Sequence, residues 1–227
     1  MQAQEAATTY LFKTWAWIEN NARGAIIAAG IIIVAILAVS FYSWRLGQKE
    51  IEAGNALSRM LLAGNGQTAD ACLKVAADFP GTKAGQRAAL QGAVALFAAS
   101  RYADAQAQFQ KFLDIYSDSS LAPEAQLGVA TSLDAQGKLD LAAGAYQNVI
   151  NNSSDQNVTA AARLGLAQIQ EQQGKPADAQ RNYEEVSRSN PNSSLASEAA
   201  MRAAQLKTKS PAVIQTDAAP VPFNLTH

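Results

Sequence analysis

Histidine and cysteine are almost absent from this chain, which has one of each among its 227 residues. The histidine is His227, so a metal site or a His-based catalytic device has almost nothing to be built from. The one cysteine, Cys72, cannot form an intramolecular disulfide and does not report the redox compartment. A small buried filler is the simplest role for Cys72, and a reactive thiol is the alternative.

Neither sign of charge dominates, because 18 Lys and Arg stand against 19 Asp and Glu. This balance gives no electrostatic case for nucleic acid as a partner. The chain also has no paired-carboxylate motif and no glycine-rich phosphate loop, so we expect neither enzyme activity nor a cofactor nor a small-molecule substrate. No segment shows the apolar–polar alternation of a strand. Alanine and glutamine are abundant instead, and we predict an all-α fold.

One long uncharged and apolar run stands near the amino terminus, from Gly24 to Trp44. As a helix, these 21 residues rise roughly 31 Å, which matches the ~30 Å hydrocarbon core of a bilayer. A buried core helix would normally keep a polar stripe, and a cleaved signal peptide would normally end in small residues, whereas this run ends in bulky ones. We therefore predict an uncleaved signal anchor with residues 24–44 as a transmembrane helix, and the other two interpretations remain as alternatives.

Residues 1–23 form a short segment before this run, and Thr9–Asn21 is a candidate amphipathic helix within it. Leu11, Trp15 and Ile18 fall on one helical face. The helix would lie on the bilayer surface, or it would simply extend the membrane helix. Basic residues are nearly equal in number on the two sides of the run, so charge alone does not decide the orientation.

A single residue pattern returns three times at intervals of 37 residues. An alanine precedes an aromatic or bulky residue by four positions, an apolar residue follows three positions later, and a small residue stands twelve positions before the alanine. Such similarity at a fixed period indicates stacked helical hairpins, each unable to bury its apolar face alone. An ordinary helical bundle, the alternative, does not require the same residues at the same phase. The repeating positions are Ala93, Ala105, Phe109 and Phe112, then Ala130, Ala142, Tyr146 and Val149, then Ala167, Ala179, Tyr183 and Val186.

Each unit of the repeat is predicted as helix A, a turn and helix B. Gly137 and Gly174 mark two of the turns, while Ser100 takes the corresponding place in the preceding unit. Helices of the last two units are expected at about 123–136, 139–150 and 158–173. The whole repeat domain is predicted at 45–208, with units at about 46–82, 83–119, 120–156 and 157–193 and a final helix at 195–207.

The two ends of the repeat domain depart from the pattern. The first unit is degenerate, with helix A expected at Ile51–Leu62, helix B at Thr68–Phe79 and Cys72 at the aromatic position. At the other end, Ser194 is the expected N-cap of the final helix. Residues 209–227 contain three prolines in a polar context and are expected to be disordered.

The framework of small, aromatic and apolar residues, with glycine at the turn and proline at the exit, resembles the tetratricopeptide repeat. The units at Ala130–Val149 and Ala167–Pro191 fit best, and the period is three residues longer than the family's usual 34. The resemblance implies a helical-hairpin array, an α-solenoid, that follows one transmembrane helix. It also implies protein partners and no catalysis.

The order of elements at the amino-terminal end is similar to the YfgM-type family of membrane-anchored tetratricopeptide proteins. A helix with Trp15 leads through Glu19–Gly24 into the span, and Tyr42–Trp44 closes it. The resemblance implies a cytoplasmic amino terminus, one span in the bacterial inner membrane and a periplasmic repeat domain. Such proteins associate with the Sec translocon and take part in periplasmic chaperone networks. The repeats also resemble envelope scaffolds of the YbgF type, so a role in outer-membrane or cell-wall assembly remains an alternative.

Tetratricopeptide arrays bind extended or helical segments along the concave face formed by helix A, and the resemblance therefore implies a groove for protein partners. None of the residues expected to line it is Lys or Arg, so a groove that holds a peptide carboxyl terminus is not expected. The alternative for each residue is plain solvated helix surface. By phase, the candidates are Val94, Phe97, Thr131, Asp134, Gln168 and Glu171.

Overall fold

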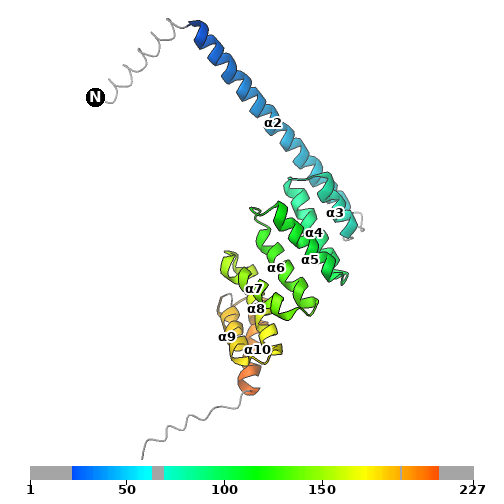
Figure 1. Ribbon diagram of the computed structural model, residues 1–227, viewed down its shortest axis with the longest axis vertical. Coiled ribbons are helices and arrows are strands. Elements are labelled where there is room, and N and C mark those ends of the chain that lie inside the picture. The colour runs from blue at the N-terminus through cyan, green and yellow to red at the C-terminus, as the bar shows by residue number, and fades with distance from the viewer. Residues whose placement is uncertain (1–21, 63–68, 190, 210–227) are drawn as a thin grey trace, which may run out of the picture.

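The computed structural model describes residues 22–62, 69–189 and 191–209 (Figure 1). The predicted amphipathic helix at Thr9–Asn21 and all but the first residue of the predicted tail at 209–227 lie outside these residues. Every regular element in the described part of the chain is an α-helix, as the composition predicts. The helices are α2 (Ala22–Leu62), α3 (Ala69–Asp78), α4 (Lys83–Ala98), α5 (Tyr102–Ile115), α6 (Ala122–Ala135), α7 (Leu139–Asn152), α8 (Gln156–Gln172), α9 (Pro176–Ser189) and α10 (Ser194–Lys209).

Helix α2 stands out from the rest of the molecule as one continuous helix of 41 residues (Figure 1). At 1.5 Å per residue it is about 61 Å long, twice the thickness of a bilayer core. Its side chains from Gly30 to Lys49 are all exposed. By length and composition, the stretch Gly30–Met60 qualifies as a candidate membrane span. The end of α2 contacts α3 and α4, so the expected helix A at Ile51–Leu62 is the last part of this same helix.

The other helices pair into the expected hairpins, α4 with α5, α6 with α7 and α8 with α9. The helices predicted at 123–136, 139–150 and 158–173 are confirmed to within two residues. Gly137 and Gly174 end helix A with φ of +73° and +71°, a left-handed conformation that glycine adopts at little cost. Ser100 adopts the same conformation, with φ of 59°, although it carries a side chain.

Helix starts in the array depend on side chains that cap free backbone N–H groups. The Asp155 carboxylate accepts hydrogen bonds from the N–H groups of Asn157 and Val158, which explains why α8 begins two residues before its predicted start. The prediction of Ser194 as the cap of α10 is wrong. The hydroxyl of Ser193 accepts from Ala196 N–H at 3.1 Å, and Ser194 is already the first helical residue.

Three apolar cores follow one another along the described part of the array, and each is built from three helices. The first joins α4, α5 and α6, the second α6, α7 and α8, and the third α8, α9 and α10. Every small, aromatic and apolar residue of the 37-residue pattern is buried in one of these cores. Each hairpin thus completes its core only with the first helix of the next unit, as expected for stacked repeats.

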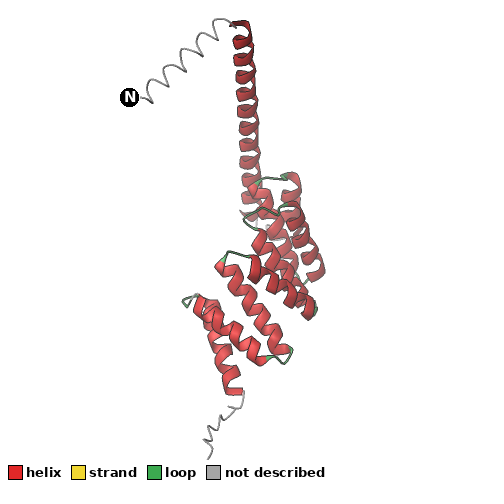
Figure 2. Ribbon diagram, turned by 60° about the vertical axis from the view of Figure 1, so that its left-hand side comes forward, coloured by secondary structure: helices red, strands yellow, loops and turns green. Residues whose placement is uncertain are grey.

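The array curves because its two sides pack differently. Helices α2, α4, α6, α8 and α10 contact one another in that order, whereas no such contacts join α3, α5, α7 and α9 within the described residues. Close approach on one side only produces a superhelix whose inner face carries the even-numbered helices. Figure 2 shows the helices stacked one after another below the long apolar helix. The groove residues predicted by phase all belong to α4, α6 and α8.

Cys72 lies in α3 with only 2% of its surface exposed. A Cβ added to Gly92 would lie 3.3 Å from Cys72 Cβ, so the cysteine packs where α3 meets α4. Burial raises the pKa of the Cys72 thiol and so lowers its thiolate fraction at neutral pH. These observations support the buried filler over the reactive thiol.

Candidate functional site

Three of the predicted groove residues meet in one apolar pocket on the inner face of the array. Val94 and Phe97 reach it from α4, and Thr131 reaches it from α6. The Thr131 hydroxyl bonds to the carbonyl oxygens of Leu127 and Gly128 at 3.1 Å. The hydroxyl hydrogen of Thr131 is therefore donated within its own helix. The pocket has a volume of about 190 Å³, and its other lining residues are Leu90, Phe109, Glu124, Leu127 and Gly128.

The other end of the same face is polar. Gln168, Glu171 and Gln172 of α8 line a second pocket of about 510 Å³ together with Arg202 of α10. Arg202 lies 3.9 Å from the Glu171 carboxylate. The pocket thus contains a cation, Arg202, that was not among the predicted groove residues. This cation is already paired with Glu171.

Asp134 lies on α6, the inner-face helix between α4 and α8. Its carboxylate accepts a hydrogen bond from the Tyr146 hydroxyl at 3.5 Å. The next unit repeats the arrangement, since the Tyr183 hydroxyl donates to Glu171 at 3.2 Å. Burial raises the pKa of Asp134, although the tyrosine hydrogen bond opposes the shift. Burial and the neighbouring carboxylates likewise raise the pKa of both tyrosines, in Tyr183 to about 12.

The acid–tyrosine pair is replaced by two phenylalanines in the preceding unit. Phe97 stands at the register of Asp134 and Glu171, and Phe109 stands at the register of the two tyrosines. Both positions change together, from a hydrogen-bonded pair to an apolar pair. The groove is therefore apolar at the end near α2 and acidic further along.

Two glycines on the groove helices were not singled out in the sequence, although they are 37 residues apart. A Cβ at Gly128 would lie 2.5 Å from the ring of Phe109, and one at Gly165 would lie 2.5 Å from the ring of Tyr146. Each ring therefore lies flush against the first helix of the next unit, as its expected gap-filling role requires. The shared period of glycine and aromatic was the signal that could have revealed this contact.

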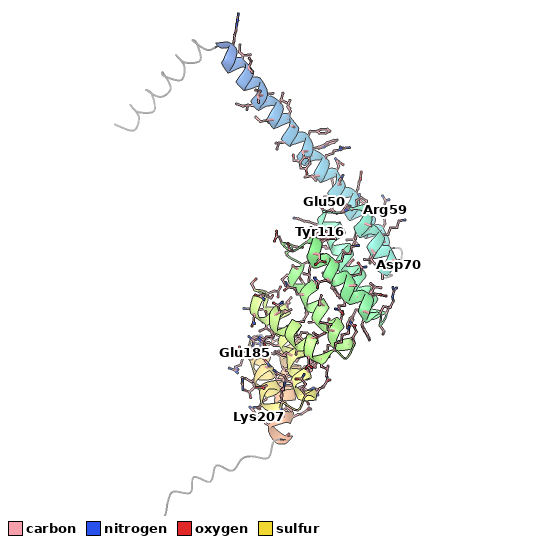
Figure 3. All side chains as sticks on the ribbon, in the orientation of Figure 1. Glu50, Arg59, Asp70, Tyr116, Glu185 and Lys207 are labelled. Carbon is pink, nitrogen blue, oxygen red and sulfur yellow. The ribbon has the colours of Figure 1, made fainter. Side chains whose placement is uncertain are left out.

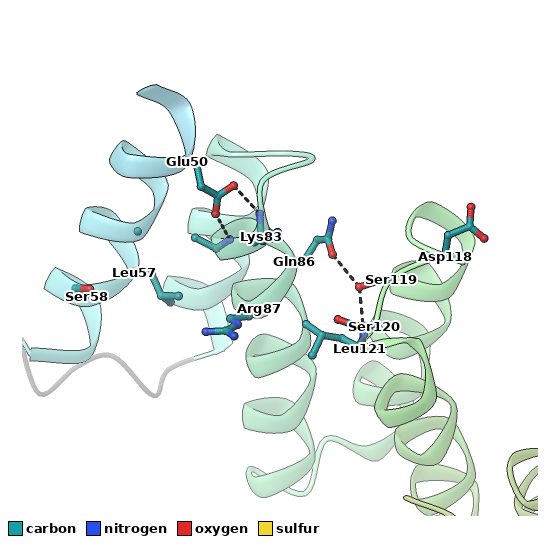
Figure 4. A pocket seen from close by; sticks show the side chains of 12 residues that line it. Glu50, Leu57, Ser58, Lys83, Gln86, Arg87, Asp118, Ser119, Ser120 and Leu121 are labelled. Carbon is teal, nitrogen blue, oxygen red and sulfur yellow. Dashed lines mark hydrogen bonds between the residues drawn. The ribbon is translucent and has the colours of Figure 1, made fainter. Parts of the chain in front are cut away.

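A polar cavity of about 720 Å³ lies where α2 joins the array, between α2, α4 and the segment that connects α5 to α6 (Figure 4). The Glu50 carboxylate of α2 accepts hydrogen bonds from the N–H groups of Lys83 and Ala84 at 2.9 and 3.1 Å. These are the first two residues of α4, so α2 supplies a charged cap to α4. Glu50 and Tyr116 lie at the end of the array that α2 enters, and Lys207 lies at the far end (Figure 3).

The fold and its inner face define a class of protein: a superhelical array of helical hairpins that carries a groove and is joined to a long apolar helix. A family model for the tetratricopeptide repeat-like domain matches residues 15–140 and again 97–197. The chain belongs to this family. Domains of this kind are protein-interaction modules that are generally non-catalytic. No curated protein sequence matches the chain.

Proposed function

We propose that this protein is a membrane-anchored adaptor at the bacterial inner membrane, an accessory factor of Sec translocation and the periplasmic chaperone network. The observation that carries the proposal is the continuity of α2. One helix contains the uncharged apolar run Gly24–Trp44, and its last part then packs against the first helices of an interaction array. A protein of this shape holds its partners close to the membrane.

In this proposal, the array lies at a short, defined distance from the bilayer. Glu50 lies six residues after Trp44, the end of the uncharged run, which is about 9 Å along a helix. This distance suits partners that emerge from, or are bound to, the membrane, such as segments leaving a translocon.

The placement in the Sec pathway rests on the similarity of the amino-terminal element order to YfgM-type proteins. In this proposal the amino terminus is cytoplasmic and the array is periplasmic. The alternative is an envelope scaffold of the YbgF type, which would hold outer-membrane or cell-wall assembly proteins in the same groove.

Site-specific photocrosslinking in intact membranes tests the proposal. A photoreactive phenylalanine replaces Val94, which is 53% exposed in the groove, and in a control it replaces Leu141 on α7, which is 63% exposed. We expect crosslinks to translocon subunits or periplasmic chaperones from position 94 and not from position 141. Crosslinks to cell-wall or outer-membrane assembly proteins would support the scaffold instead. A protein that crosslinks to neither set from position 94 contradicts both roles.

A further inference from the structure

The apolar pocket between α4, α5 and α6 has room for one side chain rather than for a small-molecule ligand. Its volume of about 190 Å³ is below the ~300–1,000 Å³ of typical small-molecule sites. Val94 and Phe97 are the groove residues that form its apolar wall, and Phe109 closes it from α5. An aliphatic or aromatic side chain from a partner would bury itself against these residues and remove their apolar surface from water.

One wall of this pocket carries an unsatisfied acceptor. Oxygen Oε2 of Glu124 is buried, and no group among the described residues forms a hydrogen bond to it. A buried acceptor without a donor costs free energy, and native structures contain few of them. A backbone or side-chain N–H of a segment bound in the pocket would supply the missing donor.

The next unit along the groove offers an acid without a cation. No Lys or Arg within the described residues forms an ion pair with Asp134, whereas Glu171 has Arg202 nearby at 3.9 Å. Partial burial raises the pKa of the Asp134 carboxyl group, because burial disfavours the ionised form. A Lys or Arg side chain from a partner would provide it.

The distance between these two features sets the spacing of the residues that would fill them. Phe97 and Asp134 are at equivalent positions on α4 and α6, which contact each other directly. Packed helices have axes about 8–10 Å apart. A polyproline II segment has three residues per turn and rises about 3.1 Å per residue, so side chains three positions apart lie on one face and are separated by about this distance.

We propose that the groove selects a protein segment in the polyproline II conformation in which a large apolar residue and a Lys or Arg are three positions apart. The apolar side chain occupies the pocket formed by Val94, Phe97 and Phe109, and the basic side chain pairs with Asp134. The inference rests on the proposed function, because it names the chemistry of the partner that the groove binds. Glu171 is less suited to a partner's cation than Asp134, because Arg202 already lies 3.9 Å from the Glu171 carboxylate.

Fluorescent peptides test this directly with the full-length protein in detergent. The probes are Pro-rich peptides, which favour the polyproline II conformation, and they carry Leu-x-x-Lys, Leu-x-x-Glu or Ser-x-x-Lys. Binding is read by fluorescence anisotropy. We expect Leu-x-x-Lys to bind at least ten-fold more tightly than either of the other two. Equal binding of the three peptides, or no binding of Leu-x-x-Lys, overturns the inference.

A charge reversal separates recognition from a general effect on folding. Asp134→Lys should reverse the preference, so that Leu-x-x-Glu binds more tightly than Leu-x-x-Lys. Asp134→Asn keeps an acceptor for Tyr146 and should reduce the preference to less than three-fold. Asp70→Lys on α3, outside the pocket, is the control and should leave the preference unchanged. If Asp134→Lys and Asp134→Asn both retain the original preference, Asp134 is not the selecting residue and the inference fails.

The crosslinking experiment distinguishes this failure from a failure of the proposed function. Crosslinked partners at position 94 together with peptides that bind equally would leave the adaptor role in place and remove only the apolar-and-basic rule. Mass spectrometry of the crosslinked segment provides a second check. The segment should contain a Lys or Arg three residues from the apolar residue nearest the crosslink, and a segment without one also contradicts the rule.

Discussion

Two glycines on the inner helices allow aromatic rings to lie against the backbone of the next unit. Gly128 receives Phe109, and Gly165 receives Tyr146. The rings fill the interface between units, and Phe109 also lines the apolar pocket. Because a side chain at either glycine would collide with a buried ring, these positions couple the packing of the array to the shape of its groove.

Gly165→Ala should therefore destabilise the array, even though alanine favours helix. The new Cβ would lie 2.5 Å from Tyr146 Cζ, and such overpacking typically costs about 1–3 kcal/mol. Gly144→Ala is the matched control, because nothing lies within 4 Å of its Cβ, and it should stabilise helix α7 by ~0.5–1 kcal/mol. Urea unfolding followed by circular dichroism measures both. Equal effects of the two substitutions would contradict the close contact.

Tyr183 should give the stability a pH dependence in the alkaline range. Burial and the Glu171 carboxylate raise the pKa of Tyr183 to about 12, from an ordinary value of 10.0. The folded state therefore holds this proton more tightly than the unfolded state does. The stability that Tyr183 contributes is fully present below pH 10 and is lost as the pH rises toward about 12.

The Tyr183→Phe variant checks this dependence, because it keeps the ring and removes the titratable hydroxyl group. Urea unfolding at intervals from pH 9 to pH 12 should show a smaller loss of stability in this variant than in the original protein. Glu171→Gln, which removes the carboxylate charge, should give an intermediate loss. An identical loss in all three proteins would mean that Tyr183 does not carry the effect.

At the scale of the element, α2 is both the candidate anchor and the first inner helix of the array. The double hydrogen bond from the amides of Lys83 and Ala84 to Glu50 fixes α4 against it. A carboxylate at a helix N-terminus is also favoured by the helix dipole. The array therefore takes its direction from the membrane helix through this junction.

Glu50→Ala should loosen the junction and cost roughly 1 kcal/mol of local stability, the usual effect of losing an N-terminal cap. Hydrogen exchange in detergent should become faster at the amides of Lys83 and Ala84 and stay unchanged in α8. Glu52→Ala is the control, since Glu52 is exposed and should not affect either region. Unchanged protection of the two amides in Glu50→Ala would show that the cap contributes little to the junction.

At the scale of the whole molecule, the one-sided packing gives the array a groove on the face of its even-numbered helices. The apolar pocket lies nearer α2 along this face, and the polar pocket with Glu171 and Arg202 lies further from it. A partner segment would thus be read from the membrane outward, first by its apolar side chain and then by its basic one. This order has meaning only if the array lies on the side of the membrane where such segments emerge.

Alkaline phosphatase fusions test on which side of the membrane the array lies. The enzyme is active only outside the cytoplasm, so a fusion after Lys207 should be active if the array is periplasmic. A fusion after Arg23, before the candidate span, should be inactive. An inactive fusion at Lys207 would place the array in the cytoplasm and remove both envelope roles.

The period of 37 residues was enough to predict the helical hairpins, their burial pattern and most helix ends. Ala142, Tyr146 and Val149 recur at one phase because every unit must bury the same face against the next. Local chemistry also predicted the turns at Gly137 and Gly174. It was wrong at Ser194, because two adjacent serines are equivalent in sequence and only the backbone course decides that Ser193 caps α10.

The sequence alone therefore predicted a repeat array, an apolar helix and candidate residues for the inner face of the array, since periodicity places residues on faces. Only the tertiary structure decided what those residues do together. It brought Val94, Phe97 and Thr131 into one pocket, and it gave Asp134 and Glu171 tyrosine partners. It also showed that Glu50 caps α4 from another helix. Such contacts join residues 12 to 37 positions apart, and their distances depend on how neighbouring helices pack.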